Sequence, residues 1–91
     1  MSTKEKIIKR FIQQTKDFTW DELVRLFVIL GFTIDNKGKT SGSRAVFKKG
    51  DDAHTVHKPH PSNIVKRYSM KQILDFLTRK GYLNEYKKED N

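Results

Sequence analysis

The chain has 91 residues, which is enough for one small domain with a thin hydrophobic core. It contains 19 Lys and Arg against 11 Asp and Glu, a net charge of +8 that favours a polyanionic partner. Cysteine is absent, which excludes disulfides, thiolate zinc sites and thiol catalysis. No apolar run reaches the length of about 18 residues that a membrane span needs, and no secretory signal is visible. We therefore expect a cytoplasmic domain without a membrane partner.

Most of the positive charge lies in the middle of the chain. Residues 36–67 carry eight basic groups and two acidic ones, a sum of +6, whereas the segments on either side each sum to +1. All three histidines, His54, His57 and His60, lie in the same stretch. A lysine-rich stretch can be a solvated surface that binds nothing, but this concentration of charge favours a binding surface.

Two helices are expected before the basic stretch. The first begins with capping-box spacing at Ser2, carries apolar residues at helical intervals and is expected to end near residues 14–17. In the second helix Thr19 is the expected N-cap, Glu22 its capping-box partner and Gly31 the residue that ends the helix. Its buried stripe is expected to contain Trp20, Leu23, Val24, Phe27, Val28 and Leu30.

Three short strands are expected next, over residues 32–35, 43–48 and 53–58. The two-residue period of a strand places Phe47 toward the core and Arg44 on the opposite face. In the third strand Val56 is expected to point inward, with His57 on the outer face beside Arg44. Register is weakly specified in such short strands, which contain few apolar residues.

The last helix is expected to begin at Ser69, with Gln72 as the capping-box partner, and to end at Gly81. Tyr68 is assigned to a hydrophobic staple, which leaves weak support for base stacking. Residues 84–91 are polar and are expected to form a frayed tail.

The element order α-α-β-β-β-α indicates an α+β sandwich, a three-stranded antiparallel sheet with helices on one face. Its open face is expected to carry Arg44, Lys48 and His57. Cutting RNA without a metal requires a base for the ribose 2′-hydroxyl, an acid for the leaving oxygen and cations for the phosphorane. His57 or His60 could transfer the protons, and Arg44, Lys48 or Lys58 could hold the charge.

A phosphate backbone could also be bound without cleavage. The candidate RNA-binding residues lie in a glycine-bracketed loop, on the strands and just before the last helix: Lys37, Lys39, Ser43, Lys48, Lys58, Lys66 and Arg67. No cofactor or metal is expected, because a strand would place His54 and His57 on opposite faces.

Several motifs occur in a fixed order along the chain. They are Gly31-Phe32, Thr40-Ser41-Gly42-Ser43-Arg44 followed by Val46-Phe47, His57-Lys58-Pro59-His60-Pro61, and Ser69-Met70-Lys71-Gln72-Ile73-Leu74 leading to Gly81. Together they resemble the HicA toxins of bacterial toxin–antitoxin pairs, from about Phe18 to Leu83. The resemblance implies a double-stranded-RNA-binding-like fold, a metal-independent mRNA interferase and a HicB-type antitoxin that covers the active surface. It divides a single domain, 1–91, into an N-terminal extension helix (1–17), a HicA-like core (18–83) and a polar tail (84–91).

The chain departs from the family at Arg44. Typical members have a catalytic histidine directly after the Gly-Ser pair, and arginine stays protonated at working pH, so it cannot take that proton. Three interpretations remain open. Arg44 could bind the scissile phosphate while His57 or His60 transfers protons, or the chain could belong to a variant branch with its own site. The third is a non-catalytic RNA-binding or antitoxin-binding protein that has lost cleavage.

Overall fold

The computed structural model of the chain describes residues 3–35, 44–59 and 61–87. In chain order its elements are α1 (Thr3–Ile12), α2 (Trp20–Ile29), β1 (Thr33–Asp35), β2 (Arg44–Lys49), β3 (Asp52–His57), α3 (Arg67–Arg79) and α4 (Asn84–Lys87). Among these described helices, none combines the length and the apolar character that crossing a bilayer requires.

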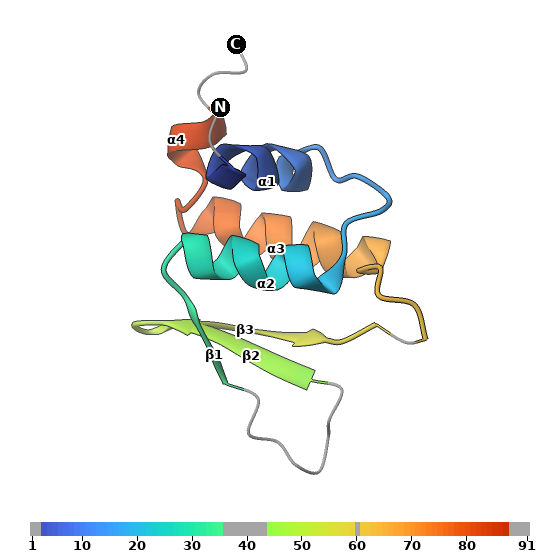
Figure 1. Cartoon of the computed structure of the whole chain (residues 1–91). Helices are drawn as coiled ribbons and strands as arrows, with labels where there is room; N and C mark the ends of the chain where they lie inside the picture. The colour runs from blue at the N-terminus through green and yellow to red at the C-terminus, as the bar shows by residue number, and fades with distance from the viewer. Residues whose placement is uncertain (1–2, 36–43, 60, 88–91) are drawn as a thin grey trace.

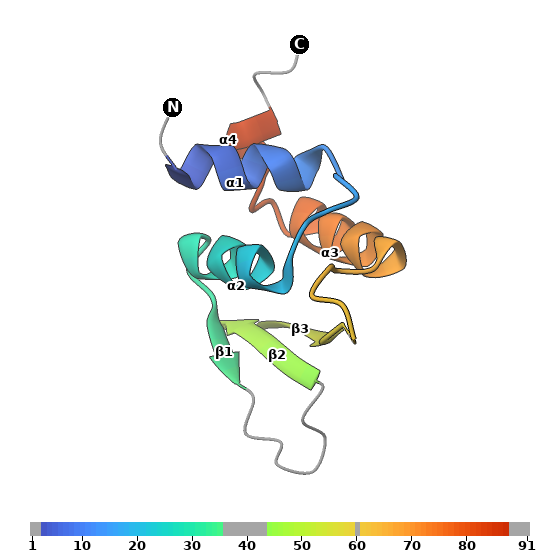
Figure 2. The same ribbon diagram turned by 45° about the vertical axis from the view of Figure 1, so that its right-hand side comes forward.

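The strands form one antiparallel sheet in the order β1-β2-β3, and the described helices all lie on one face of it (Figure 1). Helices α2 and α3 lie directly over the sheet, and α1 and α4 form a further layer above them (Figures 1 and 2). The expected α+β sandwich with helices on one face is therefore confirmed. The opposite face of the sheet is not covered by any described helix.

A single hydrophobic core joins the layers. It runs from Ile7 in α1 to Leu83 after α3, and it includes Phe47 of β2. The Phe47 ring stacks on Phe27 of α2 with a centroid distance of 4.0 Å and an interplanar angle of 10°. Since Phe47 is fully buried in this stack, it anchors the sheet to the helices and turns its neighbours on β2 toward solvent.

Both ends of α2 follow the sequence rules. The Thr19 hydroxyl accepts a hydrogen bond from the Glu22 N–H at 3.1 Å, and the Glu22 carboxylate accepts one from the Thr19 N–H at 2.9 Å. This reciprocal pair is the predicted capping box. At the other end Gly31 has a φ of 96°, a left-handed conformation that glycine adopts without strain.

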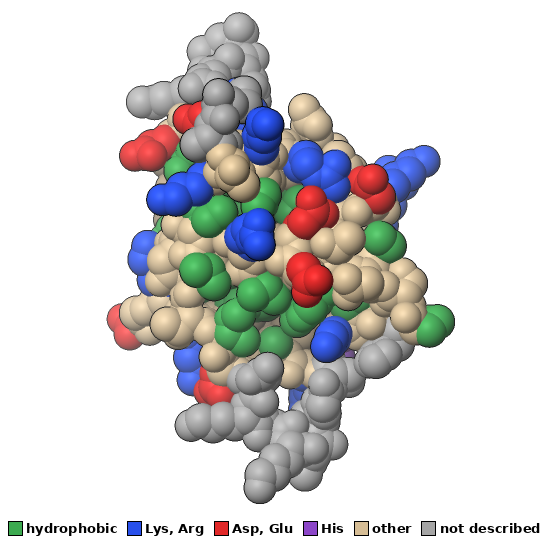
Figure 3. All heavy atoms as spheres, viewed as in Figure 1, with side chains coloured by type: hydrophobic (Ala, Val, Ile, Leu, Met, Phe, Trp, Pro, Cys, Tyr) green, Lys and Arg blue, Asp and Glu red, His purple; other side chains and the backbone are tan. Residues whose placement is uncertain are grey.

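The buried stripe of α2 differs from the prediction at two positions. Val28 was expected in the core, but its side chain is 55% exposed, and Leu26 is fully buried instead. The reason is the additional layer, because α1 packs against α2 from above and widens the buried arc on that side. Figure 3 shows the resulting hydrophobic area over α2.

The start of α3 also differs from the prediction. The helix begins at Arg67 with Lys66 as its N-cap, so Ser69 lies inside the first turn and is buried rather than capping. An isolated β-bridge between Thr19 and Ile64 holds the chain just before α3, where the Val65 N–H donates to the Phe18 carbonyl. This long-range contact sets the entry of the helix and overrides the local capping signature.

The C-terminal segment contains more structure than expected. Leu83 is fully buried and Tyr82 packs against the core, as predicted. The tail was expected to be frayed from residue 84, but Asn84–Lys87 form α4, which packs against α1. Tyr86 is half-buried against the core and explains why this polar segment is ordered.

Candidate functional site

Arg44 and His57 are paired directly across β2 and β3. Both side chains are exposed, whereas the next pair along the strands, Ala45 and Val56, is buried. Directly opposite residues in an antiparallel pair have Cβ atoms about 5 Å apart. The predicted outward register is therefore confirmed, and a guanidinium and an imidazole lie side by side on the open face of the sheet.

The basic residues of this region differ in their partners. Lys48 lies on the same face of the sheet, but its Nζ forms an ion pair with the Asp35 carboxylate at 3.3 Å. Within the described residues, Arg44, Lys58, Lys66 and Arg67 are exposed and form no ion pair. Their positive charge is thus available to an anion, whereas the charge of Lys48 is partly neutralised.

Two of these cations stand at the N-terminal end of α3. Lys66 is the N-cap and Arg67 is the first helical residue, and no side chain caps the free N–H groups of the first turn. The N-terminal end of a helix is positively polarised, so it adds to the charge of these two side chains. Four candidate residues, Lys37, Lys39, Ser43 and His60, lie outside the described residues.

His54 lies on the other face of the sheet from His57, as the strand period predicts. Its ring stacks on Phe76 of α3 with a centroid distance of 4.9 Å and an interplanar angle of 27°. Burial, with a smaller contribution from the nearby Arg79 charge, lowers the pKa of His54 below its ordinary value. His54 therefore packs against the inner face, where burial favours its neutral form.

A shallow groove runs between β3 and the first half of α3. We call it the β3–α3 groove, and its volume is about 30 Å³. Its lining includes His54, Thr55, His57, Tyr68, Ser69 and Gln72. His57 lines the groove and is also paired with Arg44 across the strands, so the groove adjoins the Arg44–His57 pair.

Tyr68 is more exposed than the sequence predicts. It was assigned to a buried staple, but its side chain is 55% exposed and lines the β3–α3 groove. The helical spacing of the buried residues Met70, Ile73 and Leu77 contains the missed signal, since Tyr68 lies off that stripe. An exposed aromatic ring next to Arg67 is a common feature of nucleic-acid surfaces.

The opposite end of the β2–β3 hairpin is clamped by polar contacts. The Tyr82 hydroxyl donates to the Asp52 carboxylate at 2.6 Å, and Lys80 pairs with the same carboxylate at 3.2 Å. These bonds lower the pKa of Asp52 below its ordinary value, and the hydrogen bond from Tyr82 has the largest effect. Lys49 donates to the Leu30 carbonyl at 2.9 Å. These contacts hold the hairpin to the helices, so its other end presents Arg44 and His57 in a defined position.

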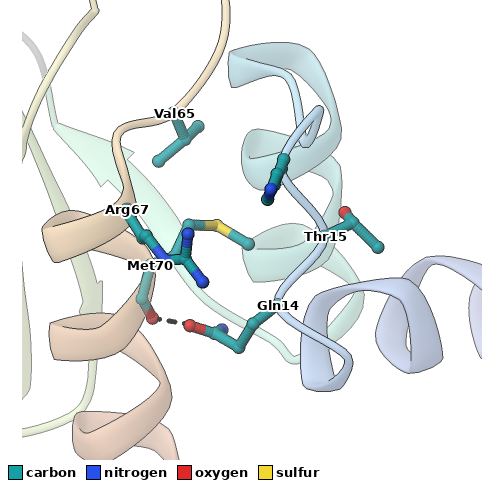
Figure 4. Close-up of a pocket in the computed structure, with 6 residues that line it drawn as sticks. Gln14, Thr15, Val65, Arg67 and Met70 are labelled. Atoms are coloured by element: carbon teal, nitrogen blue, oxygen red, sulfur yellow. Dashed lines mark hydrogen bonds between the residues drawn. The ribbon is translucent and has the colours of Figure 1, made fainter.

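A larger cavity of about 80 Å³ lies away from the sheet, between the α1–α2 connection and the start of α3 (Figure 4). It is lined by Gln14, Thr15, Lys16, Val65, Arg67 and Met70. Gln14 has a φ of 54°, and its side-chain amide donates to the backbone carbonyls of Phe11 and Met70. The cavity is far smaller than ligand pockets of about 300–1,000 Å³, and its polar contacts tie the N-terminal segment to α3.

The model of the family described as HicA toxin of bacterial toxin-antitoxin matches residues 20–77. The match runs from the first residue of α2 into α3, and it includes the β2–β3 hairpin with Arg44 and His57. Neither the curated proteins nor the solved structures contain a match to the chain.

Proposed function

The chain belongs to the HicA toxin family of bacterial toxin–antitoxin pairs, and from this premise we propose that it is a metal-independent endoribonuclease that cuts mRNA. One observation supports the proposal above all others, namely the direct pairing of exposed Arg44 and His57 on the uncovered face of the sheet. A guanidinium binds phosphate oxygens through parallel N–H donors, and an imidazole transfers protons near neutral pH.

The proposed reaction is an internal transesterification. The ribose 2′-oxygen attacks the adjacent phosphorus while a histidine removes its proton, and the bond to the 5′-oxygen breaks as that oxygen receives a proton. The products are a 2′,3′-cyclic phosphate and a free 5′-hydroxyl. Arg44 neutralises the charge that develops on the phosphorane oxygens, and His57 transfers one of the two protons. His60, three residues later in the chain, is proposed for the other.

The surrounding cations are proposed to bind the RNA backbone. Lys58, Lys66 and Arg67 are proposed because they are exposed and form no ion pair within the described residues. Lys48 is proposed as a weaker contact because Asp35 pairs with it. Further proposed contacts, outside the described residues, are Lys37, Lys39 and Ser43. Each phosphate contact of this kind makes affinity fall with salt.

Membership of a toxin–antitoxin family implies an antitoxin partner. We propose that a HicB-type antitoxin covers the open face of the sheet in the cytoplasm. An acidic protein surface would complement Arg44 and the three unpaired cations near α3, and covering these groups would exclude RNA from the site.

The experiment that tests cleavage uses purified protein, a labelled single-stranded RNA and a chelator. We expect the wild type to produce 2′,3′-cyclic phosphate ends. His57→Ala should lower the cleavage rate about 10²–10⁴-fold, because it removes a proton-transfer group. Arg44→Ala should lower it about 10²–10³-fold. Arg25→Ala removes the same side chain from an exposed position on α2 and serves as the matched control.

Two outcomes would contradict the enzyme proposal. If the wild type binds RNA with a steep salt dependence but leaves it intact, the chain is a non-catalytic RNA-binding protein. Arg44 favours that second candidate, since it stands where typical family members have a histidine. If Arg44→Ala and Arg25→Ala behave alike, the pair on the sheet is not the site.

A further inference from the structure

The β3–α3 groove combines an exposed aromatic ring and free polar groups, which binding of the RNA backbone alone does not require, with nearby cations. An aromatic ring, Tyr68, is 55% exposed at its rim. The Ser69 hydroxyl and the Gln72 amide line it and form no hydrogen bond within the described residues. Two cations, Lys66 and Arg67, directly precede Tyr68. They form no ion pair within the described residues.

These features match the chemistry of an unpaired base. Every nucleobase has a flat π-face that stacks on an aromatic ring and polar edges that accept and donate hydrogen bonds. A phosphodiester on either side of the base would meet the cations at the start of α3. In a duplex the bases are stacked inside the helix, so their faces are unavailable to Tyr68.

The position of the groove connects it to the proposed site. His57 lines the groove and is paired with Arg44 on the open face. A base held in the groove would therefore lie next to His57, one of the two groups proposed to act on the phosphodiester. At about 30 Å³ the groove is too small to enclose a whole ligand, so the base lies against Tyr68 with one edge toward Ser69 and Gln72.

We propose that the β3–α3 groove binds one unpaired base of the RNA next to the scissile phosphate, with Tyr68 as its stacking platform. The proposal rests on the proposed function, and it deepens it by assigning a base-binding groove to the same site. Tyr68 acts as a binding and positioning residue, since the proton transfers are assigned to histidines.

The test measures affinity by fluorescence anisotropy with an RNA in which every 2′-hydroxyl is methylated, so that it can bind but not be cut. The same RNA is used as a single strand and as a duplex with its complement. We expect Tyr68→Ala to weaken single-strand binding roughly 5- to 150-fold, the range for loss of one stacked base. Tyr68→Phe should keep the affinity within about threefold, because the ring remains.

Val28→Ala is the matched control, since Val28 is also 55% exposed but lies on α2. It should leave both affinities unchanged. A second measurement requires no variant: the wild type is irradiated with a single strand that carries 5-bromouridine, and mass spectrometry locates the crosslink. The expected position is Tyr68 or a neighbour in the groove.

Three results would overturn the proposal. The first is that the Tyr68→Ala variant binds the single strand as tightly as the wild type does and that the crosslink lies outside the groove. The second is an equal loss for the single strand and the duplex, which would mean that Tyr68 only supports the backbone contacts. The third is unchanged RNA affinity with weaker retention of the antitoxin, which would make the groove a protein interface. If the wild type binds neither RNA, the proposed function fails as well.

Discussion

His54 and His57 are three residues apart on one strand, yet they have different environments. His57 is exposed beside Arg44, whereas His54 stacks on Phe76 and is half-buried under α3. The strand period separates the two rings, so the face on which a histidine lies decides whether it is open to solvent or packed against a helix. Residue type alone does not distinguish them.

This difference predicts a pH dependence of stability. Burial lowers the pKa of His54 in the folded state below the unfolded value of about 6.5, so the unfolded chain binds more protons between the two values. The free energy of unfolding should be constant at higher pH and fall as the pH drops below about 6.5. Urea denaturation at a series of pH values down to about 5 measures it. Asp52 and Glu22 have lowered pKa values and lose their contributions only at more acidic pH.

The comparison variants are His54→Gln and His57→Gln. The first should remove the dependence in this window, and the second should keep it. If the free energy of unfolding of His54→Gln depends on pH as steeply as that of the wild type, another group is responsible.

At the scale of the element, α2 has the most complete set of local signals. Burial by itself raises the pKa of Glu22. The hydrogen bond from the Thr19 N–H and the contact with the Arg10 guanidinium outweigh this effect, so the pKa of Glu22 lies below its ordinary value. Arg10 forms an ion pair with Glu22 at 3.1 Å, so the capping box also links α1 to α2. The start of this helix is therefore stabilised both locally and by a neighbouring element.

We predict that Thr19→Ala destabilises the fold by about 1 kcal/mol, within the range of about 0.5–2 kcal/mol for loss of an N-cap. The reason is the orphaned N–H of Glu22. Chemical denaturation measures the change, with Thr78→Ala, exposed on α3, as a control expected within about 0.5 kcal/mol of the wild type. Equal stability of the two variants would contradict the energetic role of the cap.

At the scale of the whole molecule, α1 is part of the same core as the sheet-covering helices. Ile8 and Phe11 are fully buried, and the Phe11 ring meets Phe18 edge-on at 5.6 Å. The family match begins at residue 20, after this helix. Because the core of so short a chain is thin, α1 supplies a substantial share of the burial that stabilises the hairpin bearing Arg44 and His57.

Phe11→Ala should therefore lower the free energy of unfolding by about 3–5 kcal/mol, although Phe11 is far from the open face of the sheet. That is a large part of the stability of a domain of this size, about 5–15 kcal/mol. Thermal and urea denaturation measure it, with Gln13→Ala, exposed just after α1, as the control. A loss below about 1 kcal/mol would mean that α1 is only an appendage.

Much of the fold followed from local rules. The capping box at Thr19, the left-handed Gly31 and the outward position of Arg44 were all predicted and confirmed. The missed features depend on distant contacts. Ser69 has an ideal capping pattern, but the bridge between Thr19 and Ile64 starts α3 earlier.

The sequence by itself determined the concentration of positive charge in residues 36–67, both ends of α2 and the alternating faces of the strands. Each of these depends on residue type, on φ or on the two-residue period. Only the tertiary structure decided that Tyr68 is exposed, that the β3–α3 groove exists and that Arg44, Lys58, Lys66 and Arg67 lack ion pairs within the described residues. The physical reason is that exposure and charge pairing depend on which elements pack together, and the packing joins residues that are far apart in the chain.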